Sequence, residues 1–404
     1  MRRCAPSGGV GATQNLRRKA RLFVFAALLC GLAPSAFAQQ RPDDPDGVDR
    51  LAPDFVRASL LVAGPGDELF SCAGHACLRL ECPTYGLDYC FSYESERISD
   101  RVAAFFLGRL TMGLFAVPTA EFLKEYRDGG RGVVQYPLEL PPDAKQRLWR
   151  IMDDLAAKGA ELPYDYMKRG CSLSVMECLR EALAGHRLAV DPWPKRLSGT
   201  WREITCARVA PRAPWKILAL QLIVGTAADR ELPEMRKVIM PDDLVDVLRA
   251  AKVDGAPVLA AEGAELLPQT LDVGPPPVRP TAVALLLLAV AIANIWAKSR
   301  VADWAFLVLQ SAVGAFLAFL VFFSSLPATD WNWNIVPFNP LPLVLWRWRR
   351  FWSVPFAAVV AVWEASMLLS PHALTDPAFL VFAAAFCIVV CRDVILRLYQ
   401  RVMA

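Results

Sequence analysis

The sequence has little of what a soluble enzyme or a nucleic-acid-binding protein carries. Charged residues make up only 21% of the 404 residues, hydrophobic residues make up 55%, and the mean hydropathy is +0.31. Soluble domains average about 45–50% apolar and about 25% charged residues, so the apolar excess is more than a core absorbs. The net charge is only +4, and the chain has no basic stripe, zinc-finger spacing or RNA-binding aromatic motif. We therefore expect neither a soluble enzyme nor a nucleic-acid partner.

The apolar residues are unevenly distributed, and the first group lies close to the start of the chain. Residues 1–38 combine a basic cluster, a short apolar run and small residues before position 39, as a secretory signal peptide does. An uncleaved anchor is the alternative, and both export the residues that follow. Residues 39–50 are polar and rich in proline and aspartate, which is typical of a linker. Residues 51–271 have the composition of a mixed globular domain, which we place in the periplasm.

A second, proline-rich linker at residues 272–279 precedes a predicted membrane domain at residues 280–404. A span needs about 20 mainly apolar residues. Four candidate stretches are Pro280–Ala297, Trp304–Thr329, Phe351–Leu369 and Pro377–Cys391. The segment Trp331–Trp346 is a less obvious span, since it holds three prolines and three asparagines. The arginine cluster at 347–350 lies on the same side of the membrane as the other basic clusters only if this segment crosses the membrane. The positive-inside rule therefore predicts about five helices.

Cysteine is abundant in the predicted periplasmic domain, whereas histidine is scarce in the whole chain. The three histidines are His75, His186 and His372. The seven cysteines of residues 51–271 are Cys72, Cys77, Cys82, Cys90, Cys171, Cys178 and Cys206. An oxidising compartment favours disulfides, and an odd number leaves at least one thiol free or paired outside the chain. Zinc is the competing hypothesis, but the five-residue spacing of the first three is not usual for zinc ligands.

His75 lies at a predicted junction between a loop and a strand. The glycines and the proline before it, at positions 64–74, indicate a turn, and residues 76–80 alternate as a strand does. A histidine at such a junction is well placed to face a cleft. The alternative is a histidine on the surface or satisfied in the core.

Cys171 lies at or just before the start of a predicted helix. Ser172 and Ser174 are candidate caps for this helix, and Glu177 is acidic near its start. The N–H groups and the dipole of a helix N-terminus stabilise a thiolate and can bind an oxyanion. A neighbouring imidazole can accept the thiol proton. The alternative makes Cys171 half of a disulfide, for instance with Cys178.

A series of motifs between residues 58 and 244 resembles the Lnb N-terminal periplasmic domain family. In order they are Leu60-Leu61-x3-Pro65-Gly66-Asp67, Gly74-His75, Tyr89–Tyr93, Phe106–Leu110, Tyr126 with Arg131 and Gln135, Tyr164-x-Tyr166, Cys171-Ser172, Ile223–Asp229 and Pro241–Leu244. A membrane domain of five spans after this region is also similar to the family. The resemblance implies an α+β fold of the circularly permuted papain-like kind and a lipoprotein N-acyltransferase activity. It makes Cys171 the nucleophile and His75 the general base.

The resemblance also implies supporting residues and substrates. Ser92 stands where the family has a polar group that orients the histidine, and Tyr164 and Tyr166 are either further orienting groups or packing tyrosines. The six other cysteines of residues 51–271 would suit three disulfides. The acyl donor is a membrane phospholipid, the acceptor is a diacylated lipoprotein, and the site is the bacterial inner membrane. No metal or soluble cofactor is implied, in keeping with a sequence that has no metal motif or phosphate loop.

Two alternatives remain open at this point. One is a papain-like cysteine amidase that acts on cell-wall peptides with the same cysteine and histidine. The other is a non-catalytic envelope assembly protein in which Cys171 is a structural cysteine. The apolar segment Phe105–Val117 either admits an acyl chain or belongs to the core.

Overall fold

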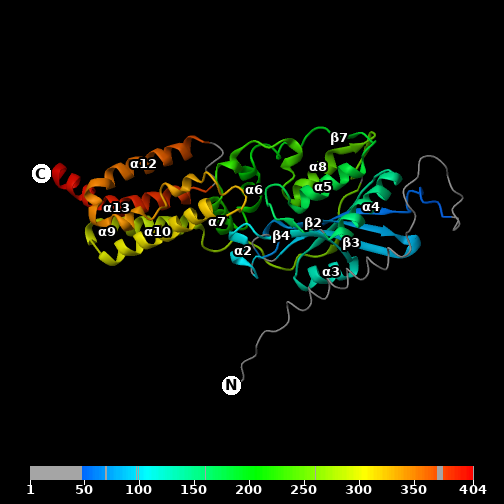
Figure 1. Cartoon of the computed structure of the whole chain (residues 1–404), viewed down its shortest axis with the longest axis horizontal. Coiled ribbons are helices and arrows are strands. Elements are labelled where there is room, and N and C mark those ends of the chain that lie inside the picture. Colours follow the sequence, from blue (N-terminus) through cyan, green and yellow to red (C-terminus); the bar gives the residue numbers. More distant parts are fainter. Residues whose placement is uncertain are drawn as a thin grey trace, which may run out of the picture.

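The computed structural model describes residues 48–68, 71–96, 98, 100–159, 161–259, 261–370 and 376–403. A globular body of strands and helices is followed by an elongated bundle of helices (Figure 1). The predicted class, an α+β domain followed by a helical membrane domain, is confirmed. The predicted signal peptide, most of the linker at 39–50, and His372 lie outside the described residues.

Seven antiparallel strands form the main sheet of the globular domain, in the order β10-β5-β1-β2-β3-β4-β6. The strands are β1 (Arg57–Ala63), β2 (His75–Cys82), β3 (Leu87–Ser95), β4 (Thr111–Pro118), β5 (Val133–Pro137), β6 (Leu162–Pro163) and β10 (Ala264–Leu267). A small second sheet contains β7 (Leu188–Val190), β8 (Ala251–Val253) and β9 (Ala256–Pro257). The alternating run at 76–80 therefore belongs to a central strand, as its pattern predicts.

Side chains alternate between the two faces of the main sheet along each strand, so both faces have side chains to pack. Helices cover both of these faces. The helices of the domain are α2 (Val102–Phe106), α3 (Thr119–Asp128), α4 (Pro142–Lys158), α5 (Cys171–Ala182), α6 (Trp201–Val209), α7 (Pro214–Ile223) and α8 (Pro241–Ala250). Leu78 and Leu80 of β2 pack with α4, α5 and α8, whereas Cys77 packs with Phe122 of α3 on the opposite face (Figure 1). This arrangement fixes α5 against the face of the sheet next to β2.

Four of the described helices are long and apolar enough to cross a membrane. They are α9 (Pro280–Ala297), α10 (Arg300–Phe323), α12 (Arg349–Leu369, extended at its start by residues 346–348) and α13 (Ala378–Met403). Buried polar contacts tie them together at the end far from the globular domain. Arg392 of α13 donates to both carboxylate oxygens of Asp303 at 2.6 and 2.7 Å, and Asn294 of α9 donates to the same Asp303 at 2.8 Å. Arg349 donates to Asp393 at 2.6 Å, so α10 and α12 begin at the same end of the bundle.

The segment 331–346 corrects one prediction, because it does not form a continuous membrane-spanning helix. It contains only the 3-10 turn η5 (Trp333–Ile335) and the four-residue helix α11 (Leu341–Val344). Its three prolines lack the N–H group that a helix interior needs. The segment nevertheless runs the length of the bundle, since α10 ends beside the globular domain and α12 begins at the far end (Figure 1). It connects the two ends as an irregular chain.

Neighbouring polar groups satisfy the backbone of this irregular chain. Gln310 of α10 donates to the carbonyl of Pro337 at 2.7 Å, and Asn339 donates to the carbonyl of Val336 at 2.7 Å. Gly314 of α10 allows the close approach, because a Cβ there would lie 2.4 Å from the Cα of Asn339. Non-helical backbone is tolerated at membrane depth only where protein or a polar cavity covers it, and these contacts provide that cover.

The globular domain is docked directly on one end of the bundle. Ser324, just after α10, donates to the carbonyl of Phe106 at 2.5 Å. Gly108 has φ 69°, and a Cβ there would lie 2.3 Å from the backbone of Ser325, so glycine is required. The segment Phe105–Val117 accordingly divides between α2, which docks on α10, and β4 of the sheet, an arrangement that matches the core interpretation of this segment.

Candidate active site

Cys171 is the first residue of α5, immediately after the N-cap residue Gly170. The helix start is therefore where the sequence predicts it. The predicted caps are wrong, because no side chain caps this helix, and Ser172 is buried inside its first turn. Gly170 has an extended backbone with φ −76° and ψ 159°. The half-buried Cys171 thus lies beside backbone N–H groups that have no acceptor within the helix.

His75 is the first residue of β2 and follows a glycine that the turn requires. Gly74 has φ 86°, and a Cβ there would lie 2.8 Å from the carbonyl oxygen of Ala63. The turn delivers the imidazole to the end of β2 that faces the start of α5. His75 Nε2 lies 2.7 Å from Oγ of Ser92, which is fully buried on β3. Nδ1 is then the ring nitrogen left for a partner on the other side.

The side chains of His75 and Cys171 are hydrogen-bonded to each other, and each changes the pKa of the other. Burial acts to raise the pKa of the Cys171 thiol, but the charge and hydrogen bond of His75, with the N–H of Ala76 and the hydroxyl of Ser172, lower it to about 7. Burial acts to lower the pKa of His75, yet the neighbouring Cys171 raises it overall. The pair therefore favours a thiolate beside an imidazolium near neutral pH, which is the reactive form of a cysteine nucleophile.

A second group of polar residues acts on the pair, and its acidic member is not among the residues predicted for the site. Glu94 lies two residues after Ser92 on the same face of β3, and its charge helps to raise the pKa of His75. Arg131 opposes this effect. Its guanidinium donates two hydrogen bonds to the carbonyl of Gly64, at 2.9 and 2.8 Å, and lies 4.6 Å from the ring centre of Tyr126. The two-residue repeat of β3 is the signal that could have identified Glu94.

The two predicted tyrosines have different surroundings. Tyr164 lies close enough to Cys171 for the thiolate charge, together with the larger effect of burial, to raise the pKa of its phenol. Tyr166 instead packs against Trp201, with ring centres 5.4 Å apart and ring planes tilted by 48°, and its hydroxyl donates to the carbonyl of Pro327 in the membrane domain. Tyr164 is thus within electrostatic range of the thiol, whereas Tyr166 lies at the junction of the two domains.

The other described histidine and Cys178 have partners outside this pair. His186 is held between two carboxylates, with Nδ1 2.7 Å from Asp254 and Nε2 3.1 Å from Asp143. Cys178, the suggested disulfide partner of Cys171, has its sulfur 3.3 Å from the hydroxyl of Tyr93. No disulfide joins the nine cysteines of the described ranges, so the structure gives no support to the predicted disulfides. Within the same ranges, no group of three or more His, Cys, Asp or Glu residues is placed to hold a metal ion.

These features define a class of protein: a membrane-anchored α+β domain with a cysteine–histidine pair between a helix N-terminus and a central strand. Residues 47–206 match the Lnb N-terminal periplasmic domain, and residues 273–401 match the Lnb transmembrane domain. The two matches cover more than two thirds of the sequence. The chain belongs to the Lnb family, and it is a lipoprotein N-acyltransferase-like membrane protein with a periplasmic domain. No curated protein and no solved structure matches it.

Proposed function

We propose that the chain is a lipoprotein N-acyltransferase of the bacterial inner membrane, with Cys171 as the nucleophile and His75 as the general acid and base. The observation that carries the proposal is the hydrogen-bonded pair itself, in which His75 lowers the pKa of the Cys171 thiol to about 7. A thiolate at neutral pH is what attack on an ester requires. The Lnb family membership supports the substrate class, an acyl lipid as donor and a lipoprotein as acceptor.

In the first step, the Cys171 thiolate attacks the carbonyl carbon of an acyl ester in a membrane phospholipid. The C–S bond forms as the ester C–O bond breaks, and the His75 imidazolium gives its proton to the departing lysophospholipid oxygen. The N–H groups at the start of α5 are placed to stabilise the negative charge that develops on the carbonyl oxygen. The product of this step is a thioester on Cys171.

In the second step, the α-amine of a diacylglyceryl-cysteine attacks the thioester carbonyl. The C–N bond forms, the C–S bond breaks, and His75 takes a proton from the amine, which restores the thiolate–imidazolium pair. The new amide carries the third acyl chain of the lipoprotein. Ser92, 2.7 Å from Nε2, fixes the orientation of the imidazole through both steps, and the charge of Glu94 favours its protonated form.

The position of the pair suits substrates that reside in a membrane. Tyr164, which is within electrostatic range of the thiol, and Tyr166, at the domain junction, belong to one apolar cluster with Phe316 and Leu320 of α10. The cluster joins the surroundings of Cys171 to the membrane helices without a flexible connection. The membrane domain therefore keeps the thiol close to both lipid substrates and raises their effective concentration.

The test is mass spectrometry of the full-length protein after incubation with phosphatidylethanolamine of defined acyl chains. We expect one acyl group on Cys171, and no adduct in Cys171→Ser or His75→Ala. Cys178→Ser, seven residues along the same helix, is the matched control and should still be acylated. An adduct that persists in Cys171→Ser contradicts the proposal. Cleavage of a cell-wall peptide by Cys171 without acylation would instead favour a cysteine amidase.

A further inference from the structure

A hollow separate from the Cys171–His75 pair lies where the globular domain meets the membrane helices. About 430 Å³ of empty space lies between its walls, part of it open to the surroundings. Its walls come from the end of α7 and the turn that follows, from residues 332–334, and from α12 and α13. Neither Cys171 nor His75 is among the residues that line it.

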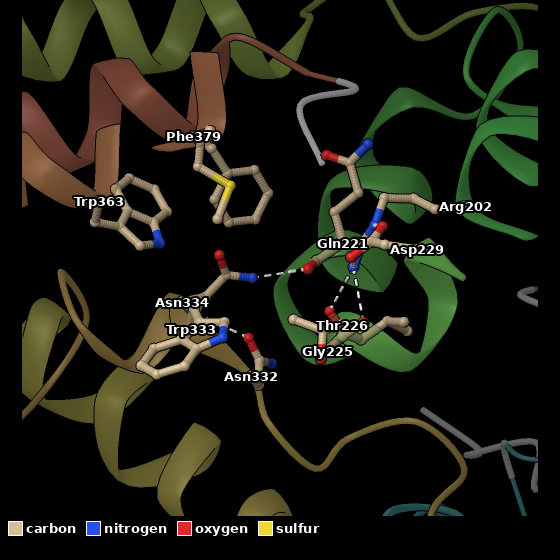
Figure 2. A pocket seen from close by; sticks show the side chains of 12 residues that line it. Arg202, Gln221, Gly225, Thr226, Asp229, Asn332, Trp333, Asn334, Trp363 and Phe379 are labelled. Atoms are coloured by element: carbon tan, nitrogen blue, oxygen red, sulfur yellow. Dashed lines mark hydrogen bonds and ion pairs between the residues drawn. The ribbon is translucent and has the colours of Figure 1, made fainter. Parts of the chain in front are cut away.

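The walls divide into an apolar side and a polar side. Figure 2 shows Trp363 and Phe379 across the hollow from the turn that contains Thr226, with Asn334 between them. The backbone and side chain of Asn334 are held by other groups, since its Nδ2 donates to the carbonyl of Gln221 at 2.9 Å. An occupant would therefore meet aromatic rings on one side and amide and hydroxyl groups on the other.

One buried donor faces this hollow with no acceptor. Trp363 is only 5% exposed, and no described residue accepts a hydrogen bond from its Nε1. Figure 2 shows this nitrogen turned inward, on the side of Asn334. Buried indole N–H groups usually find a partner, because an unpaired one costs about 1–3 kcal/mol. The unpaired donor points to an acceptor that binds here.

The charges in the wall indicate an uncharged acceptor. Arg202 is the cation of the hollow, and it is already neutralised by Asp229, with Nε 2.6 Å from Oδ1. Its Nη2 also donates to the carbonyls of Val224 and Gly225 at 3.0 Å each. Among the described residues that line the hollow, no positive charge is left to bind a phosphate or a carboxylate. A neutral carbonyl, beside an apolar chain that packs on the aromatic rings, suits both sides of the wall.

The hollow lies near the depth of lipid ester groups. Trp363 lies six residues before the end of α12, or about 9 Å at 1.5 Å per residue, and this end is next to the globular domain. Because α12 has 21 residues and is about as long as the hydrocarbon core of a bilayer is thick, Trp363 lies inside that core, within about 9 Å of its boundary with the head groups. We propose that the hollow binds the glycerol-ester region of a diacyl lipid, with Trp363 Nε1 donating to an ester carbonyl. The identity of the ligand as a diacylglyceryl lipid rests on the proposed function.

Both substrates of the proposed reaction contain a glycerol diester, so the experiment has two arms. Full-length Cys171→Ser protein, which cannot turn over, is irradiated with phosphatidylethanolamine or with a synthetic diacylglyceryl-cysteine peptide, each carrying a diazirine near an ester. We expect cross-links on residues 332–334, or on Trp363, Met367 or Phe379. Labelling by the phospholipid alone assigns the hollow to the donor, labelling by the lipopeptide alone assigns it to the acceptor, and mutual competition assigns it to both.

Trp363→Phe keeps the ring and removes the donor. It should weaken labelling about fivefold, as expected for one neutral hydrogen bond. Trp348→Phe, at the opposite end of the same span, should leave labelling unchanged. Should Trp363→Phe fold poorly, Thr226→Val on the facing wall should reduce labelling in its place. Labelling that is absent from the hollow, or unchanged in both variants, overturns the inference. Acylation of Cys171 is measured separately, so its loss defeats only the proposed function.

Discussion

The thiolate of Cys171 should depend on His75, and the structure gives the size of the effect. With His75 present the thiol has a pKa of about 7, whereas an unpaired thiol has 9.0 and burial raises that further. The difference of two units corresponds to about 2.7 kcal/mol at 1.36 kcal/mol per unit. At pH 7 about half of the wild-type thiol is ionised, against about one part in a hundred in His75→Ala. The reaction of Cys171 with an alkylating agent at pH 7 should therefore slow by about fiftyfold.

Alkylation by iodoacetamide, followed by peptide mass spectrometry between pH 5 and pH 10, measures this directly in the full-length protein. Because the folded pKa of Cys171 is lowered, the thiolate should be present above about pH 7 in the wild type and only above about pH 9 in His75→Ala. His186→Ala is the matched control, since that histidine is held by Asp143 and Asp254. A midpoint that stays near pH 7 in His75→Ala would refute the electrostatic reasoning.

Three further predictions concern orientation, domain docking and topology. Ser92→Ala should slow acylation of Cys171 about fivefold and change its pH profile, because His75 loses a hydrogen bond of about 1 kcal/mol; an unchanged profile would remove Ser92 from the site. Tyr166→Phe should lower the melting temperature by about 2–4 °C without changing alkylation of Cys171, and slower alkylation would instead give Tyr166 an orienting role. In Arg347→Cys, an impermeant maleimide should label the new thiol only after the inner membrane is opened; labelling in intact spheroplasts would contradict a crossing by 331–346.

The sequence predicts the elements that carry the two reactive groups, and it does so for local reasons. The turn before His75 requires glycine at position 74, and the helix after Cys171 has a continuous helical pattern. What brings these groups together is the packing of α5 against β2, which no local pattern encodes. Glu94 was missed for a related reason, because its effect on His75 depends on which face of β3 it occupies.

The membrane domain shows a different limit of sequence reasoning. The arginines at 347–350 indicate that the chain returns to the far end of the bundle, and the contact between Arg349 and Asp393 agrees with that path. The prediction that residues 331–346 cross as a helix was wrong. The cover for an irregular chain comes from Gln310 and Gly314, on a helix more than 20 residues away. Long-range compensation of this kind is invisible to a hydropathy window.

The direct docking of the globular domain on the bundle determines how far Cys171 can reach. Gly225 N–H donates to the carbonyl of Ala328 at 2.6 Å, and Asn332 donates to the carbonyl of Leu222 at 2.8 Å. The height of the thiol above the bilayer is therefore fixed by these contacts, and lengthening the segment 272–279 would not change it. On the proposed function, this fixed height selects substrates by the distance of their amine from the membrane. An amine attached directly to a lipid anchor can reach the thioester on Cys171, whereas an amine held far from the membrane cannot.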